Sequence, residues 1–368
     1  MAAGAGHPGV FLYHAVHPFD LTDWHIKNAE QSLPLTAVLL FVSPWGMPFF
    51  FLIAGTGTWF AMQRRTAGQY LRERTLRLLI PFFAGCLLLT PLMLTLEWMH
   101  KTWTGELTGT LADFIAARPF VLGPQMFGWA GYHLWFLGFL FSFSLLGVPL
   151  FQWLKGAAGY SLRSRLIALV ERRGGFLFAL IPLIAVQVLF RIFFLEGEHN
   201  WADFAYMFLY FTAGYLLYTD QRFLEAIARD SGWVLATALL TSAFLLIVAA
   251  TGDVFAWIEM PQTPQFYLAW SIYVINGWSW TLLLLLIGRR SLNFTNPWLQ
   301  YGQQAIVPFF MLHQPVIMTI AFFVVQWDAP ILPKALLVLA GSFAATLALY
   351  EFVIRRIRPL RMLFGMKT

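Results

Sequence analysis

The sequence predicts an all-α, polytopic membrane helix bundle with about ten transmembrane helices. Hydrophobic residues make up 59% of the chain and charged residues 11%, whereas about 25% of a soluble domain is charged. Apolar runs recur that reach the length of about 20 residues needed to cross a bilayer. Most of the 24 Lys and Arg residues fall in alternate segments between these runs. Together these patterns indicate membrane-spanning helices and their orientation.

Each apolar run defines one expected helix. In chain order the expected helices cover residues 2–17, 35–63, 76–98, 132–154, 175–195, 203–219, 232–251, 266–288, 303–326 and 332–354. The first is short, and its Gly4, Gly6 and Pro8 are poor helix formers.

Charge sets the orientation, because Lys and Arg are retained on the cytoplasmic side. The basic segments, expected to be cytoplasmic, are 64–77, 155–173, 220–230, 289–290 and 355–367. The segments expected outside, which hold most of the acidic residues, are 18–34, 97–131, 196–202, 252–265 and 327–331. The C-terminus is therefore predicted to be cytoplasmic. The long outer segment, with Trp98, Trp103 and Trp129, is expected to lie along the membrane surface.

Residues 1–368 are expected to form one integral-membrane domain, since the chain shows no internal repeat or soluble appendage. The net charge of +6 comes from short loops, so topology explains it better than nucleic-acid binding does. The single cysteine, Cys86, excludes an intrachain disulfide.

Pro44, Gly46, Pro48, Gly55 and Gly57 interrupt the expected helix 35–63. Such breaks are tolerated where backbone lines a cavity. Close helix packing through small residues is the other interpretation. The sequence leaves both open.

Polar side chains inside apolar helices are candidates for function. His14 and His17 lie three residues apart and share a face if the segment is helical. His14 is a candidate general base, because histidine titrates near neutral pH; a pair of interfacial histidines is the alternative. His133 begins the helix 132–154, and His313 lies near the middle of 303–326. No third ligand with suitable spacing stands beside His14 and His17, so no metal site is predicted.

Arg72, Arg74 and Arg77 belong to the densest basic cluster. Guanidinium groups at a cytoplasmic mouth suit a polyphosphate. Anchoring by the positive-inside rule, or contact with anionic lipids, is the alternative. Arg191 either snorkels to the surface or pairs with Glu196 or Glu198.

The segments together resemble the bacterial membrane acyltransferase-3 family, and the likeness covers essentially the whole chain. The matching features are His14 at the end of the first helix, residues 46–55, the arginine run ending at Pro81, residues 133–137 and residues 312–315. Residues 24–30 and 349–365 look closest to the branch that contains the succinyltransferase of periplasmic glucans. The chain departs from the family pattern at Ala3, where members carry Arg or Lys, and at Glu73, where a basic residue is usual. Compared with the family, the first helix also lacks its upstream half, so the resemblance implies a truncated first helix.

The resemblance implies an O-acyltransferase of the bacterial inner membrane that moves an acetyl or succinyl group from cytoplasmic acyl-CoA to a hydroxyl of a carbohydrate or related cell-envelope acceptor. It implies that His14 is catalytic and that the Arg72, Arg74 and Arg77 cluster faces the phosphates of CoA. His17, His133, His313 and Arg191 are the candidates for substrate binding. Acyl-CoA, the acceptor and the bilayer are the expected partners, with no tightly bound cofactor and no nucleic acid.

A transporter that exports a glycan or lipid precursor is the alternative function. Ion-coupled carriers place carboxylates near the bilayer midplane and show repeated halves. The acidic residues of this chain cluster instead at helix ends and in outer segments. This distribution favours the enzyme.

Overall fold

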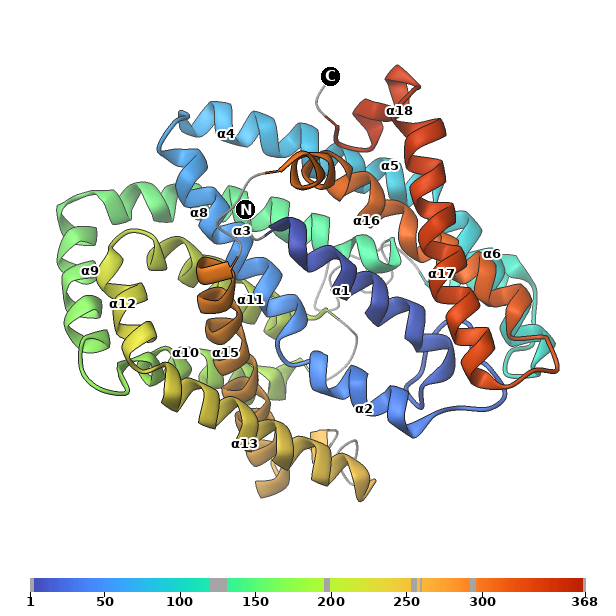
Figure 1. The fold of residues 1–368 in the computed structure, drawn as a ribbon, viewed down its shortest axis with the longest axis horizontal. Coiled ribbons are helices and arrows are strands. Elements are labelled where there is room, and N and C mark those ends of the chain that lie inside the picture. The colour runs from blue at the N-terminus through green and yellow to red at the C-terminus, as the bar shows by residue number, and fades with distance from the viewer. Residues whose placement is uncertain are drawn as a thin grey trace.

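The structure, a computed structural model, describes residues 3–118, 131–194, 199–252, 257–258, 260–291 and 296–366, with side chains from residue 9 onward. Every regular element in these ranges is helical (Figure 1). The α-helices are α1 (Ala3–Val16), α2 (Leu33–Val42), α3 (Gly46–Met62), α4 (Ala67–Arg74), α5 (Ile80–Leu88), α6 (Thr90–Trp103), α7 (Leu111–Ala116), α8 (Trp135–Lys155), α9 (Ala157–Val170), α10 (Leu180–Ile184), α11 (Trp201–Leu217), α12 (Gln221–Arg229), α13 (Ser231–Ala250), α15 (Pro264–Ser291), α16 (Pro297–Val324), α17 (Ile331–Leu349) and α18 (Arg358–Leu363). The predicted all-α class is thus confirmed for the described residues.

Seven helical segments in the described part of the chain are long and apolar enough to cross a membrane. They are Leu33–Met62, Tyr132–Lys155, Gly175–Phe193, Ser231–Ala250, Pro264–Ser291, Pro297–Val324 and Ile331–Ile354. Ala67–Leu88 and Thr90–Trp103, bent by 41°, make an eighth if the pair is one span. These segments agree with eight of the predicted helices and describe a multi-pass membrane protein.

The predicted count of about ten spans is not confirmed, because two of the expected helices are too short. α1 has 14 residues and α11 has 17. At 1.5 Å per residue they measure about 21 and 26 Å, less than the hydrocarbon thickness of about 30 Å. Both pack against neighbouring helices of the bundle.

Pro44 and Gly46 break the helix expected at 35–63 into α2 and α3. The hydroxyl of Tyr273 donates to the carbonyl oxygen of Ser43 at this break, at 3.0 Å, and so satisfies backbone that the helices do not. Gly55 has a different role. A Cβ atom on Gly55 would overlap the carbonyl oxygen of Phe211 in α11, so this glycine permits close packing of α3 on α11.

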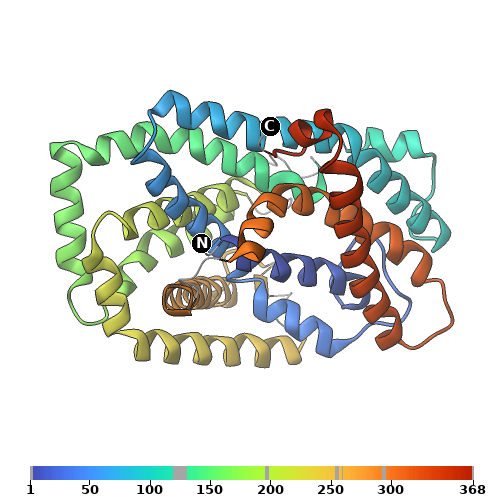
Figure 2. The ribbon, with the colours of Figure 1, turned by 45° about the horizontal axis from the view of Figure 1, so that its top comes forward.

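α1 packs against α16 and α17, and Figure 2 shows the dark-blue helix beside the orange one. Phe11, Ala15 and Phe19 are buried against apolar residues of α16 such as Ile317 and Met318. These contacts fix the end of α1 within the bundle. The end of α1 carries the first candidate histidine.

The long outer segment expected at 97–131 is partly helical. α6 continues to Trp103, and α7 follows, while the indole N–H of Trp98 donates to the carbonyl oxygen of Gly109 at 3.2 Å. Trp129 lies outside the described residues. The C-terminal end of α6 thus lies beside the segment that follows α1, because the backbone N–H of Lys27 donates to His100.

Candidate active site

Four histidines meet inside the bundle and form what we call the histidine cluster: His14, His17, His133 and His313. His14 lies in the last turn of α1, His17 begins the next turn, His133 precedes α8 and His313 lies in mid-α16. The ring centres of His14 and His313 are 5.2 Å apart, and those of His133 and His313 are 4.8 Å apart. His14 lies 6.4 Å from His133 and 6.1 Å from His17. The tertiary structure therefore brings together all four histidines proposed from the sequence.

The backbone of α16 holds the ring of His133. Its Nε2 lies 2.8 Å from the carbonyl oxygen of Phe310 and 3.2 Å from that of Met311. Carbonyl oxygens only accept, so Nε2 carries the proton. Pro315 has no N–H and leaves the carbonyl of Met311, four residues earlier, without its helical donor. His133 supplies the donor that this proline removes from α16.

His313 donates through Nδ1 to the same carbonyl of Phe310, at 2.5 Å. The protons of His133 and His313 are thus both held by backbone. The Nδ1 of His14 is buried and forms no hydrogen bond with any described residue. The Nδ1 of His133 is likewise buried without a hydrogen bond in the described structure, but the ring of His133 is fixed through its Nε2, whereas no hydrogen bond among the described residues holds the ring of His14. That arrangement suits a group which exchanges a proton with a substrate.

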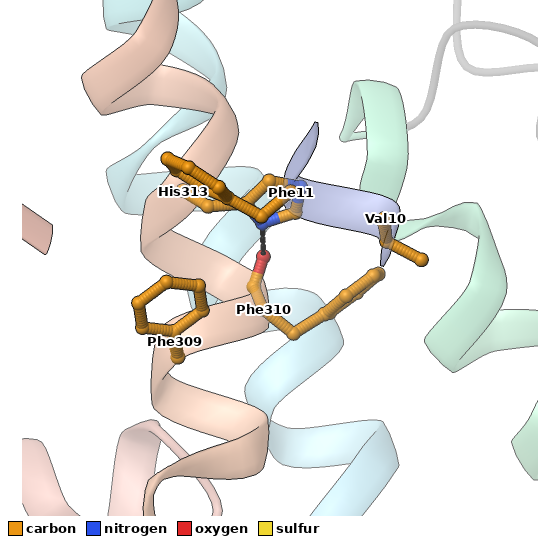
Figure 3. Close-up of a pocket in the computed structure, with 5 residues that line it drawn as sticks. All are labelled: Val10, Phe11, Phe309, Phe310 and His313. Carbon is orange, nitrogen blue, oxygen red and sulfur yellow. Dashed lines mark hydrogen bonds between the residues drawn. The ribbon is translucent and has the colours of Figure 1, made fainter. Parts of the chain in front are cut away.

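An apolar niche adjoins His313 (Figure 3). Its walls are formed by Val10 and Phe11 of α1 and by Phe309 and Phe310 of α16. The niche has no room for a water molecule. These rings therefore keep water away from one side of the histidine cluster.

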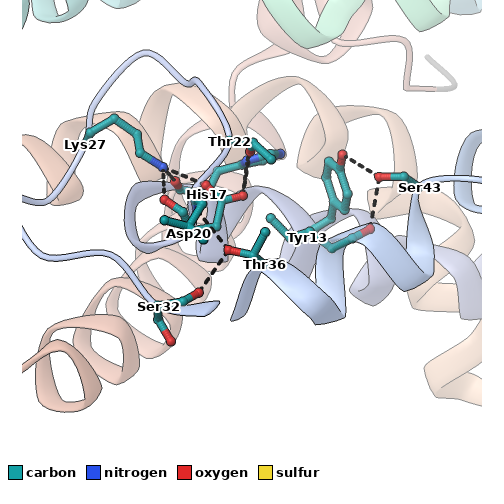
Figure 4. A network of polar contacts seen from close by, with 10 residues as sticks. Tyr13, His17, Asp20, Thr22, Lys27, Ser32, Thr36 and Ser43 are labelled. Carbon is teal, nitrogen blue, oxygen red and sulfur yellow. Dashed lines mark hydrogen bonds and ion pairs between the residues drawn. The ribbon is translucent and has the colours of Figure 1, made fainter. Parts of the chain in front are cut away.

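Asp20 anchors His17 (Figure 4). Its Oδ2 lies 3.1 Å from Nδ1 of His17 and accepts a hydrogen bond from Thr22 at 2.6 Å. Lys27 donates through Nζ to Oδ1 of Asp20 and to the backbone oxygens of His17 and Asp20, each at 2.6 Å. Burial opposes ionisation of Asp20, but the hydrogen bonds from His17, Lys27 and Thr22 outweigh it and lower the pKa of the carboxyl. Asp20 is therefore a buried anion that orients His17.

A chain of aromatic rings links His17 to Glu97 of α6. The ring of His17 stacks on Trp24 at 5.6 Å, and Trp24 lies 5.3 Å from His25. His25 Nδ1 is 3.0 Å from a carboxylate oxygen of Glu97, which also accepts from Tyr132 at 2.9 Å. Glu97 is buried and also pairs with Lys101 and Arg118. This network connects α6 and the segment that follows α1 to the histidine cluster.

Asp20 and Glu97 were not predicted as functional residues, although the sequence holds a signal for each. Asp20 follows His17 by three residues, a spacing that suits a carboxylate–imidazole pair. Glu97 is the single acid in the sequence of α6, TPLMLTLEWMHKTW. A lone carboxylate in an apolar helix is a candidate in its own right.

The arginine cluster lies apart from the histidines. Arg72 is exposed, Arg74 lies over the ring of Tyr70 at 4.9 Å, and Arg77 pairs with Glu73 at 3.7 Å. None of the three arginines forms a hydrogen bond, ion pair or ring contact with the histidine cluster in the described part of the chain. Figure 1 shows α4 along one edge of the molecule and α1 near its middle. A π-helical turn, Thr75–Leu79, begins directly after Arg74 and contains Arg77. The spacing of the two arginines therefore differs from that in an uninterrupted α-helix.

Arg191 also lies outside the histidine cluster. It pairs with Asp203 of α11, donates to Gln187 at 2.7 Å and lies over the ring of Trp270 at 4.0 Å. The structure therefore shows pairing inside the bundle rather than snorkelling. The alternative partners, Glu196 and Glu198, lie outside the described residues. A role of Arg191 in substrate binding stays a prediction.

The chemistry that the cluster can perform is proton transfer. Among the described residues, no group of three or more His, Cys, Asp or Glu side chains is arranged to hold a metal ion. Three imidazoles with ring centres 4.8–6.4 Å apart, close to a niche without water, can instead pass a proton to or from a substrate hydroxyl.

Comparison with known proteins agrees with this chemistry. Residues 9–351 match the family described as an acyltransferase domain. The proteins named glucans biosynthesis protein C from Salmonella agona and Salmonella enteritidis PT4 are 23% and 24% identical to the chain over 367 residues, which cover 96% of the chain and 90% of each relative. No solved structure shows significant similarity to the chain.

Proposed function

The chain belongs to the acyltransferase family that residues 9–351 match, and on that premise we propose that this membrane O-acyltransferase moves an acetyl or succinyl group from cytoplasmic acyl-CoA to a hydroxyl of a cell-envelope carbohydrate. The observation that carries the proposal is the meeting of His14 with His133 and His313 at ring-centre distances of 4.8–6.4 Å. We place the protein in the bacterial inner membrane with its C-terminus in the cytoplasm. The distribution of basic segments supports this orientation.

His14 acts as the general base. Its free nitrogen takes the proton of the acceptor hydroxyl while the hydroxyl oxygen attacks the thioester carbonyl carbon of acyl-CoA. The tetrahedral intermediate collapses, the carbon–sulfur bond breaks, and the proton on His14 passes to the leaving sulfur. The products are the ester and CoA with a free thiol. General acid–base catalysis accelerates such a reaction about 10²–10⁴-fold. Positioning of the two substrates supplies the remainder of the rate enhancement.

Arg72, Arg74 and Arg77 hold the phosphates of CoA at the cytoplasmic side. Their guanidinium groups offer paired N–H donors that match phosphate oxygens. Because they lie apart from the histidines, the long pantetheine arm bridges the two places. His17 and Asp20 orient His14 and the acceptor, and His133 and His313 flank the thioester.

The acceptor is a glucan or a related polymer. The relatives from Salmonella carry the name glucans biosynthesis protein C and match 96% of this chain. The outer segments that pack around His17, with Trp24, His25 and Lys27, provide the approach for such an acceptor.

Acyl transfer in inverted membrane vesicles tests this proposal. We expect vesicles with the wild-type protein to transfer label from acetyl-CoA or succinyl-CoA to a glucan acceptor, and those with the His14→Ala variant to lose the transfer. His199→Ala is the matched control, because His199 stacks on Trp135 at 3.9 Å, outside the cluster. Equal thermal unfolding of both variants in detergent would show that the loss is chemical. Wild-type transfer by His14→Ala would overturn the assignment.

A further inference from the structure

A pocket of about 520 Å³ opens at the helix ends that the charge pattern assigns to the outer face, beside the Lys27 network. Three separate segments form it: residues 27–31 after α1, residues 100–106 at the end of α6, and residues 325–326 at the end of α16. The residues that the argument uses are Lys27, Gln31, His100, Trp103, Glu106 and Gln326. All three segments belong to regions, or lie at the ends of helices, that the charge pattern assigns to the outer face.

The lining has the chemistry that binds sugars. Trp103 is 59% exposed and offers an aromatic face, against which the C–H face of a pyranose ring packs. Gln31 offers an amide and Glu106 a carboxylate at exposed positions, and both groups form hydrogen bonds with hydroxyls. Most of the residues that line the pocket carry polar side chains, which a ligand rich in hydroxyls can engage and a lipid chain cannot.

His100 adds a buried donor to the pocket. Its Nε2 accepts the backbone N–H of Lys27 at 3.0 Å, so in the neutral ring the proton is on Nδ1. That Nδ1 is buried and forms no hydrogen bond with any described residue, and only 3% of the His100 surface is exposed. A buried donor without an acceptor costs free energy. A ligand hydroxyl would supply the acceptor.

Lys27 connects this pocket to the histidine cluster. Its backbone N–H donates a hydrogen bond to His100 in the pocket wall. Its Nζ donates to Asp20 and to the carbonyl oxygen of His17. A ligand in the pocket therefore lies one residue away from the network that orients His17. This proximity points to a substrate of the same reaction rather than to a separate site.

We propose that this pocket binds the carbohydrate acceptor, with a glucosyl unit stacked on Trp103 and its hydroxyls bonded to His100, Gln31 and Glu106. The inference rests on the proposed function, because it assigns the acceptor of that reaction to a defined place. It adds a binding step that does not require acyl-CoA. The step can therefore be measured separately from acyl transfer.

Calorimetric titration of the full-length protein in detergent with a short gluco-oligosaccharide, without acyl-CoA, tests the proposal. We expect Trp103→Ala to weaken binding about tenfold or more, equivalent to about 1.4 kcal/mol, and Glu106→Gln to weaken it to a smaller extent. Trp298→Ala is the matched control: Trp298 is 81% exposed but lies near the first residue of α16, whereas the pocket lies at the other end of that 28-residue helix.

His14→Ala separates the two proposals. If it binds the oligosaccharide as the wild type does and fails to transfer the acyl group, both stand. If it transfers the acyl group while Trp103→Ala loses binding, the catalytic assignment fails and the pocket stands. Absence of binding by the wild type, or binding by Trp103→Ala equal to that of Trp298→Ala, would overturn the pocket.

Discussion

The ring of His14 lies 5.2 Å from that of His313, although the two residues come from opposite ends of the chain. The contact exists because α1 packs on α16 and α17 through Phe11 and Ala15. It places an imidazole with a free nitrogen beside one whose proton is held by the carbonyl of Phe310. His313 therefore sets the surroundings in which His14 exchanges its proton.

We expect His313→Gln to lower kcat for acyl transfer by about 10²-fold, the lower end of the contribution of a general acid–base group, with little change in KM for acyl-CoA. The glutamine keeps hydrogen-bonding capacity but cannot titrate. Steady-state kinetics with saturating acceptor would measure both constants. An unchanged kcat would show that His313 takes no part in the proton transfer.

His133 and Pro315 are expected to be coupled. His133→Leu removes the donor to the Met311 carbonyl that Pro315 leaves unbonded, and an unsatisfied buried polar group costs about 1–3 kcal/mol. In a Pro315→Ala background the helical N–H returns, so His133→Leu should cost less. A double-mutant cycle on unfolding in detergent would measure the difference. Equal costs in the two backgrounds would contradict this account of α16.

Arg74→Gln is expected to raise KM for acyl-CoA about tenfold while leaving kcat near the wild-type value, because one charge-assisted contact to phosphate is lost far from the chemistry. Arg64→Gln, in the same basic segment and exposed, is the control. The comparison needs kinetics over a range of acyl-CoA concentrations. A KM that rises equally in both variants would favour general positive-inside anchoring over a CoA site.

Gly55→Ala is expected to destabilise the protein strongly, since the added methyl group would overlap the Phe211 carbonyl and force α3 away from α11. Overpacking typically costs about 1–3 kcal/mol. Gly57→Ala is the matched control: a Cβ there meets no atom within 4 Å. Thermal unfolding of the two variants should differ in midpoint, and similar midpoints would contradict the close approach.

Asp20 is expected to make the fold sensitive to acid. Burial alone would raise its pKa, but hydrogen bonds from His17, Lys27 and Thr22 lower it below the ordinary value of 3.8. A carboxyl whose pKa is lower in the folded protein than in the unfolded protein stabilises the fold at pH values above its unfolded-state pKa. This stabilisation is lost as the pH falls through the folded-state pKa. Asp20→Asn should therefore unfold more easily at pH 7 and lose less stability than the wild type below about pH 4.

Unfolding in detergent from pH 7 to pH 3 would measure this effect. Asp328→Asn is the control, because Asp328 is exposed and lies outside the Asp20 network. If Asp20→Asn and the wild type lose stability in parallel below pH 4, the ionised Asp20 does not stabilise the fold.

Apolar runs and charge were sufficient to predict a helical membrane protein and most of its spans, since a bilayer accepts few other structures. The spans predicted for α1 and α11 are not confirmed. Both sequences are apolar enough to suggest spans, but their helices have only 14 and 17 residues and pack closely on neighbouring helices. Apolar residues alone do not distinguish a lipid-facing helix from one buried by protein.

The amino-acid sequence by itself identified a multi-pass membrane protein and the four histidines. A buried charge or an unpaired polar group in a membrane costs so much free energy that each polar side chain in an apolar helix is informative. Only the tertiary structure decided that His14, His133 and His313 share one site, that Asp20 and Lys27 hold His17, and that Arg191 pairs with Asp203. The histidine contacts and the Arg191–Asp203 pair join residues from separate helices, and the Asp20–Lys27–His17 contacts form where one segment folds back on itself. The sequence pattern of a segment carries no record of which neighbour it packs against.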